Sequence, residues 1–240
     1  MLSFTDPNSK SYARTAGLFY LTIAVAGGYA IAYVPGQIQL PGDAAGTVRN
    51  LLGQRGLFLS GLAGDVVMML AELAVTAMLF FMFRAVNPTL SLIAGLARFV
   101  MVTVMAAMLF FHVGAMALAD PGAGLGAFTQ AQRADLVGLM LRIHDGGVWI
   151  WQLFFAVHLL VLGGLIVQSR AYPRLIGYAM MLGAMGYLAD SLHAFALPDV
   201  VLLGYVKVAL LIVVTLAELG FALWLVFRGP KGLGKLQPAR

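Results

Sequence analysis

The sequence predicts an all-α, polytopic membrane protein built as a bundle of six transmembrane helices. The first observation behind this is composition, since 61% of the 240 residues are hydrophobic and only 10% are charged, against roughly 25% charged in a typical soluble domain. The second is that six apolar segments have about the 20 residues needed to cross the hydrocarbon core. A soluble globular fold is therefore excluded, because so few charges cannot cover its surface.

The six predicted spans account for most of the chain. In order they are 15–34, 57–83, 88–119, 147–168, 174–197 and 200–227. Lys10 and Arg14 precede a first apolar run that is longer than a signal-peptide core and has no clear small-residue cleavage site, so we expect it to be retained. The predicted organisation is an N-terminal segment 1–14, a six-helix transmembrane domain 15–227 and a basic tail 228–240.

The longer connections between the spans differ in pattern. Residues 35–56 read as a loop containing Gly and Pro, whereas TQAQRADLVGLMLRIHDGG in the third loop alternates apolar and charged residues at helical spacing. Thr129 is the predicted N-cap of this second segment and Gly146 its predicted stop. The third loop is therefore expected to carry one interfacial helix lying on the membrane surface.

Basic residues in the short connections predict the orientation of the bundle. Four fall on one side, Arg49, Arg55, Arg133 and Arg142, and nine on the other: Lys10, Arg14, Arg84, Arg170, Arg174, Arg228, Lys231, Lys235 and Arg240. This bias predicts that both termini are cytoplasmic. The scattered placement of the basic residues argues against a nucleic-acid partner, and the lack of cysteine excludes disulfides and thiolate metal sites.

Six charged residues lie inside the predicted spans, where a charge costs roughly 2.5 to 3.5 kcal/mol on insertion scales. They are Asp65, Glu72, Arg98, Asp190, Lys207 and Glu218, and three histidines join them: His112, His158 and His193. Asp65 and Glu72 are seven residues apart, two helical turns, and so share one face of their helix. Polar residues placed in such stripes indicate the interior of a bundle.

Depth along the spans predicts which opposite charges meet. Glu72 and Arg98 each lie about ten residues from the turn at 84–87, so we expect a structural ion pair between them. Lys207 lies at a depth that matches Asp65 or Asp190. Four carboxylates nevertheless face only two cations, and the two surplus negative charges require protonation, a protonated histidine or a bound cation.

This surplus defines the candidate sites. Glu72 and Glu218 are the candidate catalytic acids, because a carboxylic acid kept neutral in the core can donate a proton. A divalent metal ion is the one cofactor that the residues suggest, and its candidate ligands are Asp65, His112, Asp190 and His193. The spacing of Asp190 and His193 recurs by chance, and hydrogen-bonded helix packing is the favoured explanation of it.

Five stretches of the chain are distinctive. They are ARTAGLFYLTIAVAG, LAGDVVMMLAELA, FRAVNPTLSLIAGLARFV, FFAVHLLVLGGLIVQS and YPRLIGYAMMLGAMGYLADSLHAFALP. Together they resemble the bacterial membrane family catalogued as domain of unknown function 4386, most specifically in VNPTLSL and GYLADS. The resemblance implies a multi-pass protein of the bacterial inner membrane and brings no established activity or catalytic residue.

Three classes of function stay open at this point. The first is acid-base or metal-assisted chemistry on a lipid-like substrate, in which a carboxylic acid protonates an alkene or epoxide, or metal-bound water hydrolyses a lipid. The second is a proton- or cation-linked transporter or a membrane sensor. The third is a structural membrane protein whose charges serve only packing. The expected partners are membrane lipid and a small apolar ligand, and the sequence decides neither enzymatic activity nor oligomeric state.

Overall fold

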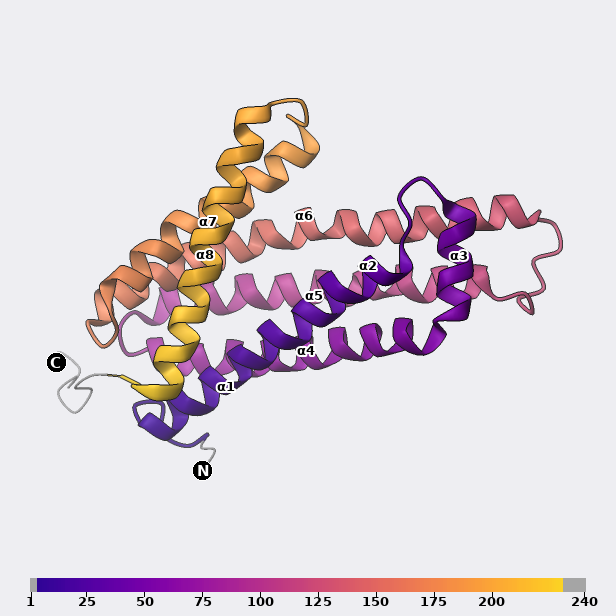
Figure 1. Cartoon of the computed structure of the whole chain (residues 1–240). Helices are drawn as coiled ribbons and strands as arrows, with labels where there is room; N and C mark the ends of the chain where they lie inside the picture. The colour runs from indigo at the N-terminus through magenta and orange to yellow at the C-terminus, as the bar shows by residue number, and fades with distance from the viewer. Residues whose placement is uncertain (1–3, 231–240) are drawn as a thin grey trace. The chain divides into compact units, whose positions relative to one another are not determined.

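The computed structural model describes residues 4–230, which form helices joined by short connections (Figure 1). In chain order the elements are α1 (Lys10–Gly27), the π-helix η1 (Gly28–Tyr33), α2 (Val34–Ile38), α3 (Ala44–Gly53), α4 (Arg55–Phe83), α5 (Pro88–Ala119), α6 (Gln130–Ser169), α7 (Arg174–Phe195) and α8 (Val201–Phe227). The first three continue into one another as a single helix, Lys10–Ile38. The end of the predicted basic tail, with Lys231, Lys235 and Arg240, lies outside the described residues.

Six helices are long and apolar enough to cross a membrane. They are Lys10–Ile38, Arg55–Phe83, Pro88–Ala119, Gln130–Ser169, Arg174–Phe195 and Val201–Phe227, and each overlaps one predicted span. Large apolar side chains also point outward from them, as at Leu175, which is 78% exposed, and Phe110, which is 77% exposed. Since water is a poor solvent for such a surface, the protein is a multi-pass membrane protein, as the composition predicts.

The surface helix predicted for the third loop is the first part of a longer helix. α6 begins with a capping box, in which Thr129 Oγ1 accepts from the Gln132 amide at 3.2 Å and Gln132 Oε1 accepts from the Thr129 amide at 2.9 Å. The predicted stop at Gly146 is wrong, because α6 continues to Ser169. A Cβ at Gly147 would lie 2.6 Å from the Met108 side chain, so this glycine allows close packing on α5 instead of ending the helix.

α3 was not expected, since residues 35–56 read as a loop. Asp43 caps this helix, its Oδ1 accepting a hydrogen bond from the Gly46 amide at 2.7 Å. The buried side of α3 contributes Leu51 to an apolar core that also contains Ile38 and Phe58. A helix of ten residues is too short to cross a membrane, and it forms because tertiary packing covers its apolar side.

Local signals position the helix ends near the polar residues. The Asn87 side chain accepts from the Leu90 amide at 3.0 Å, and Pro88 occupies the first position of α5. The Ser91 hydroxyl then donates to the Phe80 carbonyl at 2.8 Å, which ties α5 to α4 across their short turn. This turn keeps the two helices antiparallel and in a defined register.

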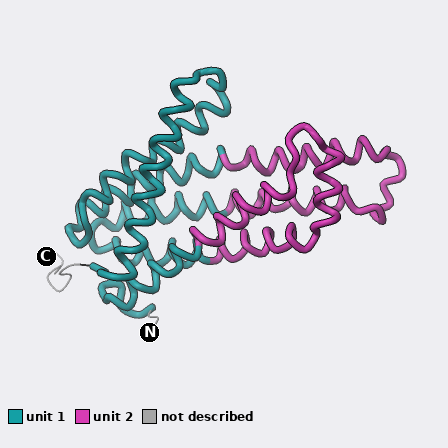
Figure 2. The backbone as a smooth tube through the Cα atoms, viewed as in Figure 1, with its two compact units in different colours: residues 1–22, 71–102, 149–240 teal, residues 23–70, 103–148 magenta. Residues whose placement is uncertain are grey.

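The chain divides into two compact units, coloured separately in Figure 2. Unit 1 comprises residues 1–22, 71–102 and 149–240, and unit 2 comprises 23–70 and 103–148. Helices α1, α4, α5 and α6 contribute residues to both. Of the six charged residues inside the predicted spans, unit 2 contains Asp65 and unit 1 contains the other five: Glu72, Arg98, Asp190, Lys207 and Glu218.

Glycines let the helices of unit 1 pack closely. A Cβ at Gly183 of α7 would lie 2.5 Å from Val214 Cβ of α8, and one at Gly163 of α6 would lie 2.6 Å from the Gly177 carbonyl oxygen of α7. Neither distance is compatible with a side chain. Small residues at such positions bring the backbones together and gain the van der Waals contact that holds helices in lipid.

Candidate functional site

Glu72 of α4 and Arg98 of α5 lie at the centre of a polar cluster in unit 1. Arg98 Nε donates to Glu72 Oε2 at 2.5 Å. The Arg98 side chain is 0% exposed and the Glu72 side chain is 5% exposed. The turn between α4 and α5 brings them to one level, as their depths along the spans suggest. Such a buried pair is stable because each charge compensates the other in a low-dielectric setting.

Tyr20 of α1 connects this ion pair to Glu218 of α8. The Tyr20 hydroxyl lies 3.0 Å from Arg98 Nη1 and 3.3 Å from Glu218 Oε1. A guanidinium can only donate, so the hydroxyl accepts from Arg98 and directs its own proton to Glu218. The guanidinium carbon also lies 4.8 Å from the centre of the Tyr20 ring, which adds a cation–π contact.

His158 of α6 binds Arg98 with a defined tautomer. Its Nδ1 lies 2.8 Å from the Ala94 carbonyl oxygen, and its Nε2 lies 3.0 Å from Arg98 Nη1. Because a carbonyl oxygen can only accept, Nδ1 carries the proton, and Nε2 is left as the acceptor for Arg98. His158 is thus held as a neutral ring that orients the guanidinium.

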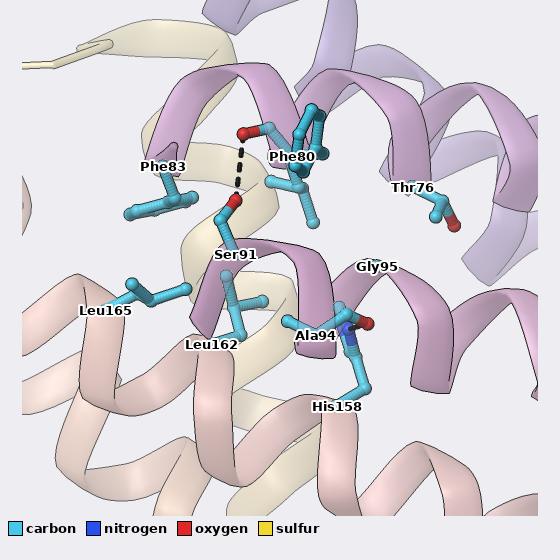
Figure 3. A pocket seen from close by; sticks show the side chains of 10 residues that line it. Thr76, Phe80, Phe83, Ser91, Ala94, Gly95, His158, Leu162 and Leu165 are labelled. Carbon is cyan, nitrogen blue, oxygen red and sulfur yellow. Dashed lines mark hydrogen bonds between the residues drawn. The ribbon is translucent and has the colours of Figure 1, made fainter. Parts of the chain in front are cut away.

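A small pocket borders His158 between α4, α5 and α6 (Figure 3). Figure 3 shows His158 projecting from α6 toward Ala94 on α5, with the Ser91 hydroxyl bonded to the Phe80 carbonyl nearby. The pocket has a volume of about 10 Å³, which is room for roughly one water molecule. It is a gap between packed side chains and too small for an organic substrate.

The structure identifies the carboxylates left over by the charge count. Glu72 pairs with Arg98 and Asp190 pairs with Lys207. Among residues 4–230, neither Glu218 nor Asp65 has a Lys or Arg within ion-pair distance. Glu218 is only half-buried, and it is close enough to Arg98 to interact with it electrostatically.

One nitrogen of the Arg98 guanidinium makes no hydrogen bond to the described residues. Nε and Nη1 are bonded as described, but Nη2 is buried without a hydrogen-bond partner among the described residues. Buried donors are rarely left unpaired in folded proteins, so Nη2 marks a point at which the hydrogen bonds of this cluster can change. We name Glu72, Arg98, Tyr20, His158 and Glu218 the Arg98 cluster.

Comparison with known proteins assigns the chain to a family. A family model described as Domain of unknown function (DUF4386) matches residues 15–229. The chain belongs to this family. An uncharacterised protein of Archaeoglobus fulgidus is 24% identical to this DUF4386 protein over 175 residues, which is 71% of this chain and 84% of that protein. No solved structure matches.

A second polar cluster of the DUF4386 protein links α6, α7 and α8. Asp190 Oδ1 accepts from Lys207 Nζ at 2.6 Å, and its Oδ2 accepts from Gln152 Nε2 at 3.0 Å. Gln152 also donates to the Ser191 hydroxyl at 3.1 Å, which in turn donates to the Trp149 carbonyl at 2.7 Å. Of the two partners considered for Lys207, the structure therefore selects Asp190. Both carboxylate oxygens are bonded, and the cluster links the three helices through these hydrogen bonds.

The four metal-ligand candidates fall in different parts of the chain. Asp65 and His112 belong to unit 2, whereas Asp190 and His193 belong to unit 1. Within residues 4–230, no group of three or more His, Cys, Asp or Glu residues is arranged to hold a metal ion.

Sequence reasoning did not single out Tyr20 or Gln152. Both were detectable as polar groups within apolar runs, because a buried hydroxyl or amide requires a hydrogen-bond partner. What the sequence lacks is any indication of the partner, since Tyr20 and Glu218 are 198 positions apart.

Proposed function

We propose that this protein is a proton-linked membrane transporter or sensor in which Glu218 binds and releases the proton. The observation that carries the proposal is the hydrogen bond from Tyr20 to Glu218, which joins a carboxyl group without a cationic partner to Arg98. An isolated carboxylate in a bilayer-embedded bundle is costly, and protonation removes its charge. Glu218 is therefore the member of the Arg98 cluster whose charge can change.

The charge balance and the hydrogen bonds of Arg98 differ between protonated and ionised Glu218. With Glu218 protonated, the charge of Arg98 is balanced by Glu72 alone. When Glu218 ionises, two carboxylates compete for one guanidinium, and the unpaired Nη2 supplies the additional donor. The hydrogen bonds then rearrange between α8 and the helices that carry Tyr20 and Arg98. A local charge change coupled to helix contacts is the usual basis of a membrane switch.

His158 has a positioning role in this proposal. Both of its nitrogens are engaged, one with Ala94 and the other with Arg98. A proton on Nε2 would place two donors against each other and break the bond to Arg98. His158 therefore holds the guanidinium in place while Glu218 exchanges the proton.

Infrared difference spectroscopy tests the assignment of the proton to Glu218. Protein in lipid nanodiscs is titrated with acid while the carbonyl stretch of a protonated carboxylic acid is recorded. We expect a band that is lost in Glu218→Gln and kept in Asp65→Asn, which removes the other carboxylate without a Lys or Arg partner. The proposal fails if Glu218→Gln folds, as judged by circular dichroism, and the band persists unchanged.

A second candidate function is acid-base chemistry on a lipid-like molecule. It is favoured by the position of Glu218 on α8, where it is half-buried between outward-facing residues such as Leu216, which is 65% exposed. An apolar molecule dissolved in the bilayer can approach such a site, and Glu218 would protonate its alkene or epoxide. Mass spectrometry of lipid extracts separates the two functions, because only the enzyme changes a lipid species between cells expressing the wild type and Glu218→Gln.

We also propose that both termini are cytoplasmic and that the membrane is the bacterial inner membrane. The excess of basic residues on one side of the bundle and the even number of spans support the cytoplasmic position of the termini. The chain has no cysteine, so single cysteines report topology directly. A membrane-impermeant maleimide should label Ala123→Cys in spheroplasts and Val86→Cys only after permeabilisation. The reverse pattern would overturn the orientation.

A further inference from the structure

Unit 2 contains a small, mostly apolar pocket that includes two ionisable side chains. It is lined by residues of η1, α2, α4 and α5, including Ala30, Pro35, Phe58, Asp65 and His112, and its volume is about 10 Å³. All of these residues belong to unit 2. Two of them, Asp65 and His112, are ionisable side chains inside candidate membrane spans.

His112 has a buried nitrogen that the described residues leave unpaired. The residue is 6% exposed, and its Nδ1 has no hydrogen-bond partner among residues 4–230. The ring is held firmly, stacked on His144 with the centroids 3.5 Å apart and contacted by Phe58 with the centroids 5.2 Å apart. These contacts define the plane of the ring, and in this position Nδ1 has no partner among the described residues.

Asp65 supplies a second polar group in the same pocket. It is 6% exposed and has no Lys or Arg partner within the described chain. His144 interacts with it electrostatically. A buried carboxyl group needs several hydrogen bonds to offset the loss of water, and the pocket between Asp65 and His112 is where another donor fits.

The π-helix adds a third polar group. The Val34 amide donates to the Tyr29 carbonyl rather than to Ala30, its acceptor in a regular α-helix. The next residue, Pro35, has no N–H to donate. The Ala30 carbonyl therefore loses two helical donors, and Ala30 is one of the residues that line the pocket. Single π-helical turns of this kind are frequent at functional sites.

We propose that this pocket binds one water molecule, which hydrogen-bonds to His112 Nδ1, to the Asp65 carboxyl group and to the Ala30 carbonyl. A water molecule has two protons, which it directs to the two oxygen acceptors, and a lone pair that accepts from Nδ1–H. Three hydrogen bonds are typical of a buried water, and the volume of the pocket matches one. The water would join an acid to an imidazole inside the membrane, which is the arrangement of a proton relay.

The sign of one stability change tests this site. In the presence of the water, His112→Phe removes a hydrogen bond and disturbs those to Asp65 and Ala30, so the Tm in nanodiscs should fall. Without the water, the same change removes an unpaired nitrogen, and the Tm should rise or stay constant. Asp65→Asn, which keeps an acceptor, should lower the Tm less than Asp65→Leu does; equal losses would count against the site.

Two further measurements keep the test decisive if His112→Phe fails to fold. A wild-type structure at a resolution that reveals ordered water should contain one density peak within hydrogen-bonding distance of His112 Nδ1 and Asp65, and its absence overturns the proposal. Thermal melts in sodium chloride and in choline chloride at equal ionic strength should coincide. A Tm raised by sodium alone would overturn the water in favour of a bound cation.

Discussion

Arg98 Nε of α5 lies 2.5 Å from Glu72 Oε2 of α4, and both side chains are buried. This ion pair is the fixed element to which the other groups of the cluster attach. Arg98 makes its remaining described bonds, to Tyr20 and His158, through Nη1. The position of the guanidinium therefore depends on Glu72, and the effect of any change nearby depends on whether this pair survives it.

Removing one partner of the pair should destabilise the protein strongly. Arg98→Met or Glu72→Leu leaves an uncompensated buried charge, and we expect each to cost about 3–5 kcal/mol. The double variant should lower the free energy of unfolding by clearly less than the sum of the two single changes. It removes both charges, so neither is left buried without its partner. Unfolding in one detergent micelle system measures all three. Strict additivity would contradict a coupled pair.

Tyr20→Phe should separate Glu218 from Arg98. The change keeps the ring and removes only the hydroxyl, so Arg98 Nη1 and Glu218 each lose a partner at an expected cost of about 1–3 kcal/mol. Tyr12→Phe on the same helix is a matched control, since the Tyr12 hydroxyl makes only a long bond of 3.4 Å to the Met78 carbonyl. If Tyr12→Phe lowers the free energy of unfolding as much as Tyr20→Phe does, the hydrogen bonds of Tyr20 to Arg98 and Glu218 add no stability of their own.

The tautomer of His158 can be observed directly. The contacts of its ring require the proton on Nδ1, facing the Ala94 carbonyl, and a free lone pair on Nε2, facing Arg98. Nitrogen-15 chemical shifts of the histidine ring distinguish the two tautomers, and His158→Gln assigns the signal. A proton found on Nε2 would mean that Arg98 does not donate to this ring.

Gly183→Ala should disrupt the packing of α7 on α8. The added methyl carbon would lie 2.5 Å from Val214 Cβ and 2.6 Å from the Val214 amide nitrogen, so the helices must move apart at a cost of about 1–3 kcal/mol. Gly220→Ala in α8 is the control, because nothing lies within 4 Å of its Cβ. There alanine should be neutral or stabilise the helix by up to about 1 kcal/mol.

Ionisation of the buried Tyr172 phenol should lower the stability of the protein in alkali. Tyr172 lies between α6 and α7, outside the candidate spans, and burial raises its pKa above the usual value of 10.0. The fold thus favours the neutral phenol. The resulting contribution to the free energy of unfolding is complete below pH 10 and is lost as the pH rises toward the folded-state pKa. Tyr172→Phe cannot ionise and should lose less stability above pH 10 than the wild type. Parallel stability curves for the two proteins would contradict the assignment.

Helix boundaries were predictable where capping chemistry is explicit. The predicted span 88–119 agrees with α5 at both ends, because Asn87 and Pro88 specify its start and Asp120 and Pro121 follow its end. The stop at Gly146 failed because a glycine ends a helix only if the backbone turns there, and close packing near Met108 keeps α6 continuous. α3 was missed because its ten residues were read together with the Gly- and Pro-containing stretch before them, although Asp43 is an N-cap and the segment is amphipathic.

Within the polar cluster, the two residues joined by a short turn were accessible to sequence reasoning. Glu72 and Arg98 lie on antiparallel helices whose register is fixed by four connecting residues, so equal depth implies proximity. Tyr20, His158 and Glu218 come from three other helices. Their rotation about the helix axes depends on packing that no local pattern encodes.

The sequence by itself determined that this protein spans a membrane and that its spans carry two more carboxylates than cations. Both follow from composition and hydropathy, which are sums along the chain. Only the tertiary structure decided that Glu218 and Asp65 are the carboxylates without a Lys or Arg partner among residues 4–230. An ion pair depends on the distance between two side chains, and that distance is set by which helix faces meet.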